Sequence, residues 1–173
     1  DVNVNNVTKN IYPKYYLPVH FVKLGKRKIE KLIKKIGIFR IKAKSIYNLS
    51  KILIEKYNSK VPKTFEELET LPGVGHKTAS VVMSQGFGYP AFAVDTHIHR
   101  LAQRWGLTNG KNVTQTEQDL KRLFPRKNWN KLHLQIIYYG REYCKARDCY
   151  GLTCKICTTC YPKRKKPIKT IKA

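Results

Sequence analysis

Apolar residues recur at helical spacing along most of the chain, and they nowhere alternate with polar residues over the length of a strand. A loosely helical segment opens the chain over 1–17. A short amphipathic helix is expected over 26–37, where glycine marks its end, and a longer one over 40–60, which the proline at position 62 follows. The first third of the chain therefore predicts helices that bury one face each.

The remaining helices are marked by local start signals. Thr64 and Glu67 form a capping box for a helix over 64–71, because each side chain can satisfy the other's backbone N–H. Further helices are expected over the segments 76–86, 95–105, 114–123 and 130–141. These patterns together predict an all-α fold.

Charge narrows the class of partner. The chain has 173 residues with 35 lysines and arginines against 11 acidic residues, a formal net charge of +24. Such an excess favours a polyanion, because each phosphate neutralised releases condensed counterions. The competing interpretation is a basic surface with no ligand. An acidic membrane surface is the weaker alternative, because no segment pairs a basic face with a clean apolar face. No apolar run approaches the length needed to cross a bilayer, and we expect no membrane partner.

The stretch "LPGVGHKTASVV", residues 71–82, joins two of the expected helices through a turn with two glycines. Glycine lets the backbone approach another molecule closely, and the N–H groups at the start of the second helix can hold a phosphate. The candidate DNA-binding residues are Leu71, Pro72, Gly73, Val74, Gly75, His76 and Thr78. The alternative is an ordinary helical hairpin that uses glycine only for its turn.

Lys77 and Asp95 are the candidate chemical groups. The positive end of a helix disfavours an ammonium ion, so Lys77 is placed where its neutral, nucleophilic amine is favoured; a surface lysine touching phosphate is the alternative. Asp95 opens the helix over 95–105 and supplies either a helix cap alone or a cap plus a carboxylate for chemistry. Glu69 is a candidate supporting acid. His97 and His99 point to different helix faces, so we expect them to pack rather than share a metal.

Five cysteines lie close together near the end of the chain. The candidate metal ligands are Cys144, Cys154, Cys157 and Cys160, with Cys149 as a possible substitute for one of them. Clustered thiols indicate metal rather than disulfides, and the spacing alone allows one tetrahedral zinc or an iron–sulfur cluster.

The motifs "LPGVGHKTASVV" and "AVDTHIHRLAQRWGL", together with the cysteine cluster, closely resemble the endonuclease III branch of the helix–hairpin–helix DNA glycosylases. The resemblance runs along nearly the whole chain. It implies a two-lobed helical fold, double-stranded DNA with damaged bases or abasic sites as substrate, and a [4Fe–4S] cluster, with zinc as the alternative. It also implies a monomer in the bacterial cytoplasm, associated with the nucleoid.

The resemblance further implies a mechanism. The lysine after the hairpin, Lys77 here, attacks C1′ of a flipped nucleotide and displaces an oxidised pyrimidine. The resulting Schiff base undergoes β-elimination, which cuts the strand 3′ to the lesion, and Asp95 is the loop aspartate that assists. Because a lysine stands at this position, we expect a bifunctional glycosylase and AP lyase.

The chain departs from the family at two places. The family's cysteine spacing is C-x6-C-x2-C-x5-C, which this chain does not keep although the overall span is the same. The family also has helices and a glutamine-bearing loop before residue 1, so we expect part of the fold to be lacking and the folding or activity of this chain to be impaired. A truncated, non-catalytic helix–hairpin–helix DNA-binding module is therefore the alternative function.

The expected organisation has three parts. A partial helical barrel spans 1–89 and contains the helix–hairpin–helix at about 64–86, and a C-terminal helical lobe with the cysteines spans 90–162. The basic tail, 163–173, is expected to be disordered.

Overall fold

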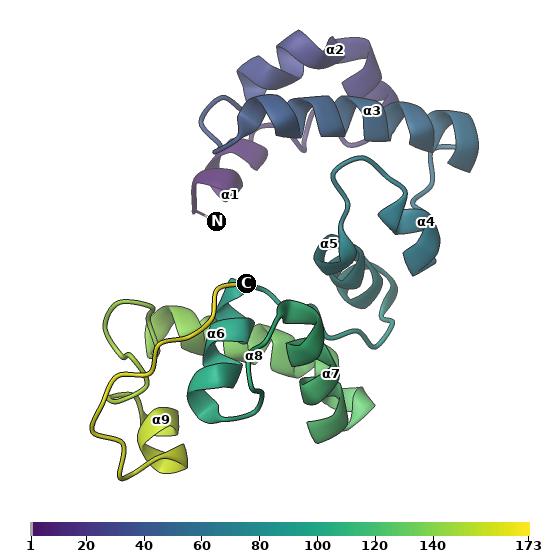
Figure 1. Ribbon diagram of the computed structural model, residues 1–173. Helices are drawn as coiled ribbons and strands as arrows, with labels where there is room; N and C mark the ends of the chain where they lie inside the picture. Colours follow the sequence, from purple (N-terminus) through teal and green to yellow (C-terminus); the bar gives the residue numbers. More distant parts are fainter. Residues whose placement is uncertain (1) are drawn as a thin grey trace. The chain divides into compact units, whose positions relative to one another are not determined.

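The computed structural model describes residues 2–173, with the side chain of Val2 excepted, as helices joined by loops (Figure 1). No strand occurs among these residues, which confirms the all-α prediction. The helices are α1 Val2–Thr8, α2 Pro18–Leu32, α3 Phe39–Tyr57, α4 Phe65–Glu69, α5 His76–Val81, the π-helix η1 Val82–Gly86, α6 Thr96–Trp105, α7 Val113–Leu123, the 3-10 helix η2 Arg126–Asn128, α8 Trp129–Glu142 and α9 Lys155–Cys160. None of these helices is long and apolar enough to cross a membrane.

The chain divides into two compact units, one ending at Gly75 and the other beginning at His76. The expected division near residue 89 lies farther along the chain. In the first unit α2 packs against α3. Its core consists of Ile11, Ile29, Ile33, Ile36 and Ala43, which come from the amphipathic segments recognised in the sequence.

In the second unit α6 packs against α7, α8 and α9 (Figure 1). The core contains Phe92, Val94, Ile98, Leu101, Ala102, Trp105, Leu120 and Ile136, together with four cysteines. Since the thiols belong to the same core as the α6 face, whatever the cysteines bind also stabilises the packing of this unit.

The helix α2 begins earlier than the sequence predicts. It starts at Pro18, and Gly25 interrupts it with a φ of 72° and a ψ of 158°. This break divides the helix into two pieces, and only the second piece carries the pattern visible over 26–37. The first turn is closed by His20, whose Nδ1 accepts hydrogen bonds from the backbone N–H groups of Tyr16 and Leu17.

The basic C-terminal tail is held against the second unit instead of lying free. The side chain of Gln103 on α6 donates to the carbonyl of Ile171 at 3.0 Å and accepts from its N–H at 2.7 Å. Arg164 donates to the carbonyls of Arg104 and Gly151. These contacts are long-range, so composition, on which the expectation of disorder rested, contains no sign of them.

Candidate active site and cysteine centre

The hairpin has the capped helix and tight turn that the sequence predicts. The Thr64 hydroxyl accepts from the N–H of Glu67 at 3.2 Å, which starts α4, and the N–H of Val74 bonds the carbonyl of Leu71 at 3.0 Å to close the turn. Leu71 is buried, so its side chain does not reach outward. Gly73, Gly75, His76, Lys77 and Thr78 are exposed, and Pro72 and Val74 are half-buried.

The two glycines of the loop, Gly73 and Gly75, differ in whether the fold of the protein requires a glycine at their position. Gly73 has a φ of +80°, and a Cβ built on it would lie 2.8 Å from Cβ of Ser45. A side chain is therefore excluded at Gly73 by the fold of the first unit. A Cβ at Gly75 would meet no heavy atom within 4 Å. Packing within the protein therefore does not require a glycine at position 75. A glycine there would instead suit the close approach of another molecule to the backbone.

Lys77 lies in the first turn of α5, and a neighbouring contact fixes that turn. Nε2 of His76 lies 3.0 Å from Oε2 of Glu117 on α7. Glu117 is buried and also pairs with Lys121 one turn further along α7. The start of α5 is thus tied to α7 by a carboxylate that two basic side chains share.

Asp95 caps α6, as the sequence predicts. Its Oδ1 accepts from the N–H of Ile98 at 2.8 Å, and the residue is 9% exposed. The segment before it, 91–94, is buried throughout. A carboxylate at the end of a buried segment keeps a fixed position, which a group acting on a substrate requires.

Lys77 and Asp95 act electrostatically on the same two histidines. Burial lowers the pKa of His97 below its ordinary value; the charge of Asp95 opposes this shift, and the charge of Lys77 adds to it. The pKa of His133 on α8 is lowered by burial and then influenced by the same two charges in the same senses. The candidate nucleophile and the candidate carboxylate therefore share one neighbourhood within the second unit.

Glu69 is the last residue of α4 and is exposed. It belongs to the first unit, and its role as a supporting acid stays a prediction. His99 behaves as a packing residue: its Nδ1 bonds the hydroxyl of Thr116 at 2.8 Å, and the ring is buried. His97 is half-buried, and its Nδ1 lies 3.5 Å from Nη2 of Arg100.

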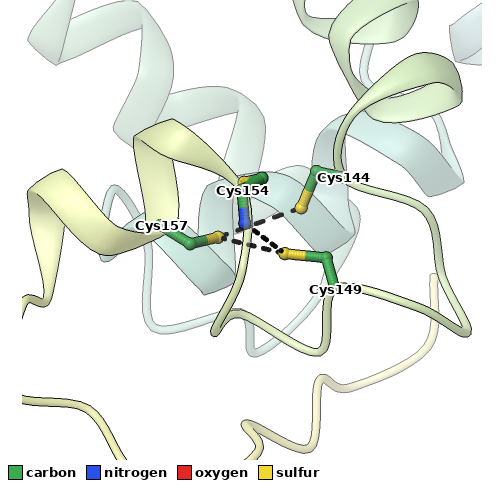
Figure 2. A group of neighbouring side chains, drawn as sticks. All are labelled: Cys144, Cys149, Cys154 and Cys157. Carbon is green, nitrogen blue, oxygen red and sulfur yellow. Dashed lines mark hydrogen bonds between the residues drawn. The ribbon is translucent and has the colours of Figure 1, made fainter.

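Four cysteine side chains converge in the second unit, as Figure 2 shows: Cys144, Cys149, Cys154 and Cys157. Their sulfur atoms all lie within 4.8 Å of one another, and all four residues are buried. Cys144 follows the end of α8, Cys149 lies in the loop after it, and Cys154 is the residue before α9.

The group contains Cys149 and leaves out Cys160, so Cys149 takes the place of Cys160, in line with the substitution that the sequence left open. Cys160 is the last residue of α9 and is exposed. Cys157 lies one turn before it and faces the other thiols. A helix turns by about 300° over three residues, so a residue two such steps beyond Cys154 no longer faces the same point.

The pKa values of three of these cysteines are shifted, which affects how the group would bind a cation. Burial raises the pKa of Cys144 to about 11, although Nη1 of Arg104 donates to its sulfur at 3.3 Å. At Cys149 burial also acts upward, but hydrogen bonds from the backbone of Cys154 and Thr153 outweigh it and lower the pKa to about 5. Burial raises the pKa of Cys157. The set thus offers one thiolate at neutral pH, while the metal would have to displace protons from the thiols with raised pKa values. Metal binding by the four cysteines therefore depends on pH.

The donor set fits a group held by four thiolates. The sulfur of Cys157 lies 3.9 Å from that of Cys144 and 3.8 Å from that of Cys149. Zinc–sulfur bonds of about 2.3 Å place the sulfurs of a tetrahedral site about 3.8 Å apart. A [4Fe–4S] cluster needs its thiolates farther apart, so holding one would require the sulfurs of Cys144, Cys149 and Cys157 to move away from one another.

The buried histidines predict acid sensitivity of the second unit. Burial lowers the pKa of His99 and His133 below the ordinary 6.5. At a pH between the folded and unfolded pKa of a ring, the unfolded chain therefore binds a proton that the folded protein does not bind. The stabilisation is therefore complete above pH 6.5 and falls as the pH drops below it, by at most about 1.4 kcal/mol per pH unit for each ring. Hydrogen bonds, first from Thr108, lower the pKa of Asp119, whose contribution is lost only at lower pH, below its ordinary 3.8.

Urea unfolding at pH 7.5, 6.5 and 5.5 measures this dependence. We expect the free energy of unfolding to decrease over this interval, and to decrease less steeply in His99→Gln. Equal slopes in the two proteins would contradict the assignment of His99.

Sequence reasoning missed three residues of this neighbourhood: His133, Glu117 and Asn130. Asn130 on α8 accepts from the N–H of Ala91 at 3.2 Å and donates to the carbonyl of Ser84 at 3.3 Å. It therefore ties α8 both to η1, which continues from the helix of Lys77, and to the segment that leads to Asp95. A lone polar residue on an amphipathic helix gives no local signal of such a role.

The chain matches the model of the HhH-GPD superfamily, base excision DNA repair proteins, over residues 1–126. It is 41% identical over 170 residues to endonuclease III of Bacillus subtilis (strain 168), covering 98% of this chain and 78% of that protein. Endonuclease III of Escherichia coli (strain K12) is 40% identical over 168 residues, 97% of this chain and 80% of that protein.

Two solved structures are similar in fold. One is a trapped covalent intermediate of endonuclease III with DNA, with a TM-score of 0.86 and 40% identity over 90% of this chain and 74% of that one. The other is a thermostable thymine-DNA glycosylase, with a TM-score of 0.79 and 25% identity over 89% of this chain and 73% of that one.

Proposed function

Because the chain belongs to the HhH-GPD superfamily of base excision DNA repair proteins, we infer that it is a bifunctional DNA glycosylase with AP lyase activity. It binds DNA, removes damaged bases and cuts the strand at the resulting abasic site. The observation that carries this inference is the shared neighbourhood of Lys77 and Asp95, in a fold similar to a glycosylase trapped covalently on DNA.

Lys77 is the proposed nucleophile. Its amine attacks C1′ of the flipped nucleotide, the bond from C1′ to the base breaks, and the base leaves with the electron pair. The bond between C1′ and O4′ then breaks, O4′ takes up a proton as the sugar ring opens, and the nitrogen and C1′ are left as a Schiff base. Loss of a proton from C2′ of the Schiff base breaks the bond from C3′ to its oxygen and expels the 3′ phosphate. The exposed position of Lys77 in the first turn of α5 lets the amine reach a nucleotide outside the protein surface.

Asp95 is the proposed assisting carboxylate. One oxygen is held by the cap of α6, so the group is fixed while its negative charge stands near Lys77 and the sugar. A fixed negative charge stabilises the cationic sugar that develops as the base leaves. The exposed backbone of the hairpin, from Gly73 to Thr78, is the proposed phosphate contact.

A pair of substitutions separates the two roles of Asp95. Asp95→Ser keeps an oxygen that can cap α6 but removes the charge, so we expect a free energy of unfolding within about 0.5 kcal/mol of wild type and a loss of base excision of about a hundredfold. Asp95→Ala should also cost about 1 kcal/mol of stability. Single-turnover excision and urea unfolding are the two measurements. If Asp95→Ser excises the base as fast as wild type, the role of Asp95 is limited to capping α6.

Oxidised pyrimidines are the proposed lesions, which the resemblance to endonuclease III supports. We also propose that the protein acts as a monomer, on bacterial chromosomal DNA in the cytoplasm.

The four buried cysteines would hold a [4Fe–4S] cluster, whose chemistry here would be to fix the loop from Cys144 to Cys157 onto the core of the second unit. A zinc ion in the same place is the second candidate, favoured by the sulfur separations of 3.8 and 3.9 Å.

The test of the function uses duplex DNA with one thymine glycol, and a second duplex with one abasic site. We expect base release from the first, strand cleavage 3′ to the site in both, and a covalent protein–DNA adduct when borohydride is present. An undamaged duplex of the same sequence is the control. Tight binding without base release, cleavage or adduct would instead support the non-catalytic DNA-binding module.

A further inference from the structure

His133 is a buried histidine whose ring has no hydrogen-bond partner among the described residues. It lies in the middle of α8, is 3% exposed, and neither Nδ1 nor Nε2 has a partner. A neutral imidazole carries one donor and one acceptor, and leaving such a group unpaired in the interior costs about 1–3 kcal/mol. A residue that served packing alone could be apolar without this cost.

The charged groups near His133 are the two that are proposed to carry out the reaction. The charged groups that act on its ring are Asp95, before α6, and Lys77, on α5. Asn130 lies one turn before His133 on α8 and binds the segments that carry both groups, through Ala91 and Ser84. The elements that present the nucleophile, the carboxylate and the histidine are therefore joined at one place.

Asp95 has an oxygen available to such a partner. Its Oδ1 is engaged by the N–H of Ile98 at 2.8 Å, and no described residue donates to Oδ2. Oδ2 of Asp95 is not among the buried atoms that lack a partner, so this oxygen is open to solvent, whereas both ring nitrogens of His133 are buried and unpartnered. A water molecule at this oxygen could also bond the ring of His133, and would then have the two polar contacts that an ordered water needs.

We propose that His133 is a positioning residue for Asp95, donating through an ordered water molecule to the carboxylate oxygen that the helix cap leaves free. The proposal rests on the proposed function of Asp95. Two contacts, the cap on Oδ1 and the water on Oδ2, then fix the plane of the carboxylate as well as its place.

A neutral ring suits this role better than a charged one. Burial lowers the pKa of His133, and the charge of Lys77 adds to this effect although Asp95 opposes it. A charged imidazolium would pair with Asp95 and cancel the negative charge that the developing sugar cation requires. A neutral imidazole orients the carboxylate and leaves its charge in place.

The test compares His133→Leu, which removes both ring nitrogens at similar size, with His133→Gln, which keeps a donor and an acceptor. His99→Leu is the matched control, since His99 is also a buried histidine of the second unit. The measurements are single-turnover excision of thymine glycol at saturating enzyme, the dissociation constant for the same duplex, and the thermal midpoint.

We expect His133→Leu to slow excision by about tenfold to a hundredfold with an unchanged dissociation constant, and His133→Gln to stay within about threefold of wild type. His99→Leu should lower the thermal midpoint without slowing excision. If His133→Leu does not fold, His133→Met, whose flexible chain fills irregular space, takes its place with the same expectation.

The proposal is overturned if the leucine or methionine variant excises at the wild-type rate, if His133→Gln is as slow as the apolar variant, or if His99→Leu slows excision equally. Wild-type excision and borohydride trapping separate this failure from that of the proposed function. If the wild-type protein forms no adduct and releases no base, the proposed function fails and the role of His133 fails with it.

Discussion

Replacing Lys77 by alanine is expected to abolish the covalent adduct with DNA and to reduce base release and strand cleavage by about a thousandfold or more. The reason is that the Schiff base forms on the amine of Lys77 itself, which alanine lacks. His97 and His133 are within electrostatic reach of Asp95, but an imidazole cannot form a stable imine with C1′. Duplex binding should weaken only slightly, since the hairpin backbone from Gly73 to Gly75 is unchanged.

Two further variants make this result specific to the amine. Lys77→Arg keeps the positive charge but offers a guanidinium that stays protonated, so we expect it to bind DNA like wild type and to form no adduct. Lys111→Ala removes one exposed positive charge from the loop before α7 and serves as the matched control, with trapping unchanged. Borohydride trapping on an abasic-site duplex, followed by denaturing electrophoresis, measures all three. An adduct that persists in Lys77→Ala would assign the nucleophile to another amine.

The parts of this site that could be predicted are those defined by residues adjacent in sequence. The cap of α6 by Asp95 follows from an aspartate after an apolar run, and the hydrogen bond to Ile98 confirms it. The cap of α4 by Thr64 is confirmed in the same way. Such caps depend only on residues within one helical turn, so a short sequence motif is enough to predict them.

The parts that could not be predicted depend on residues distant in sequence. The pair of His76 and Glu117 joins residues 41 positions apart, and Asn130 reaches a loop 39 positions earlier. The π-helical turn η1 likewise continues an apolar pattern that reads as ordinary α-helix from 76 to 86. His133 gave no signal because a single histidine on an amphipathic helix is more often a satisfied core residue.

The cysteines show the same limit within a short segment. Spacing counts residues along the chain, and by that measure Cys160 is the predicted ligand, with Cys149 only as a possible substitute. The choice is made by α9, which begins after Cys154 and directs Cys157 inward, leaving Cys160 exposed. A loop of unknown path between Cys144 and Cys154 conceals this from the sequence.

The corresponding expectation is that Cys149→Ser lowers the metal content of the purified protein by about tenfold or more, whereas Cys160→Ser leaves it unchanged. Hydrogen bonds from the backbone around Cys154 favour the thiolate of Cys149 and lower its pKa to about 5, so it is the first ligand available at neutral pH. A serine hydroxyl does not supply that anion. Because the thiols belong to the core of the second unit, Cys149→Ser should also lower its thermal midpoint.

Elemental analysis for iron and zinc, with the visible absorption spectrum of anaerobically purified protein, decides both the ligands and the group they bind. Iron and sulfide in equal amounts with a brown colour would establish the cluster and mean that the cysteine sulfurs move apart to admit it. One zinc per chain in a colourless protein would match the observed sulfur separations of 3.8 and 3.9 Å. Loss of metal in Cys160→Ser with retention in Cys149→Ser would reverse the ligand assignment, and would require α9 to turn so that its last residue faces the core.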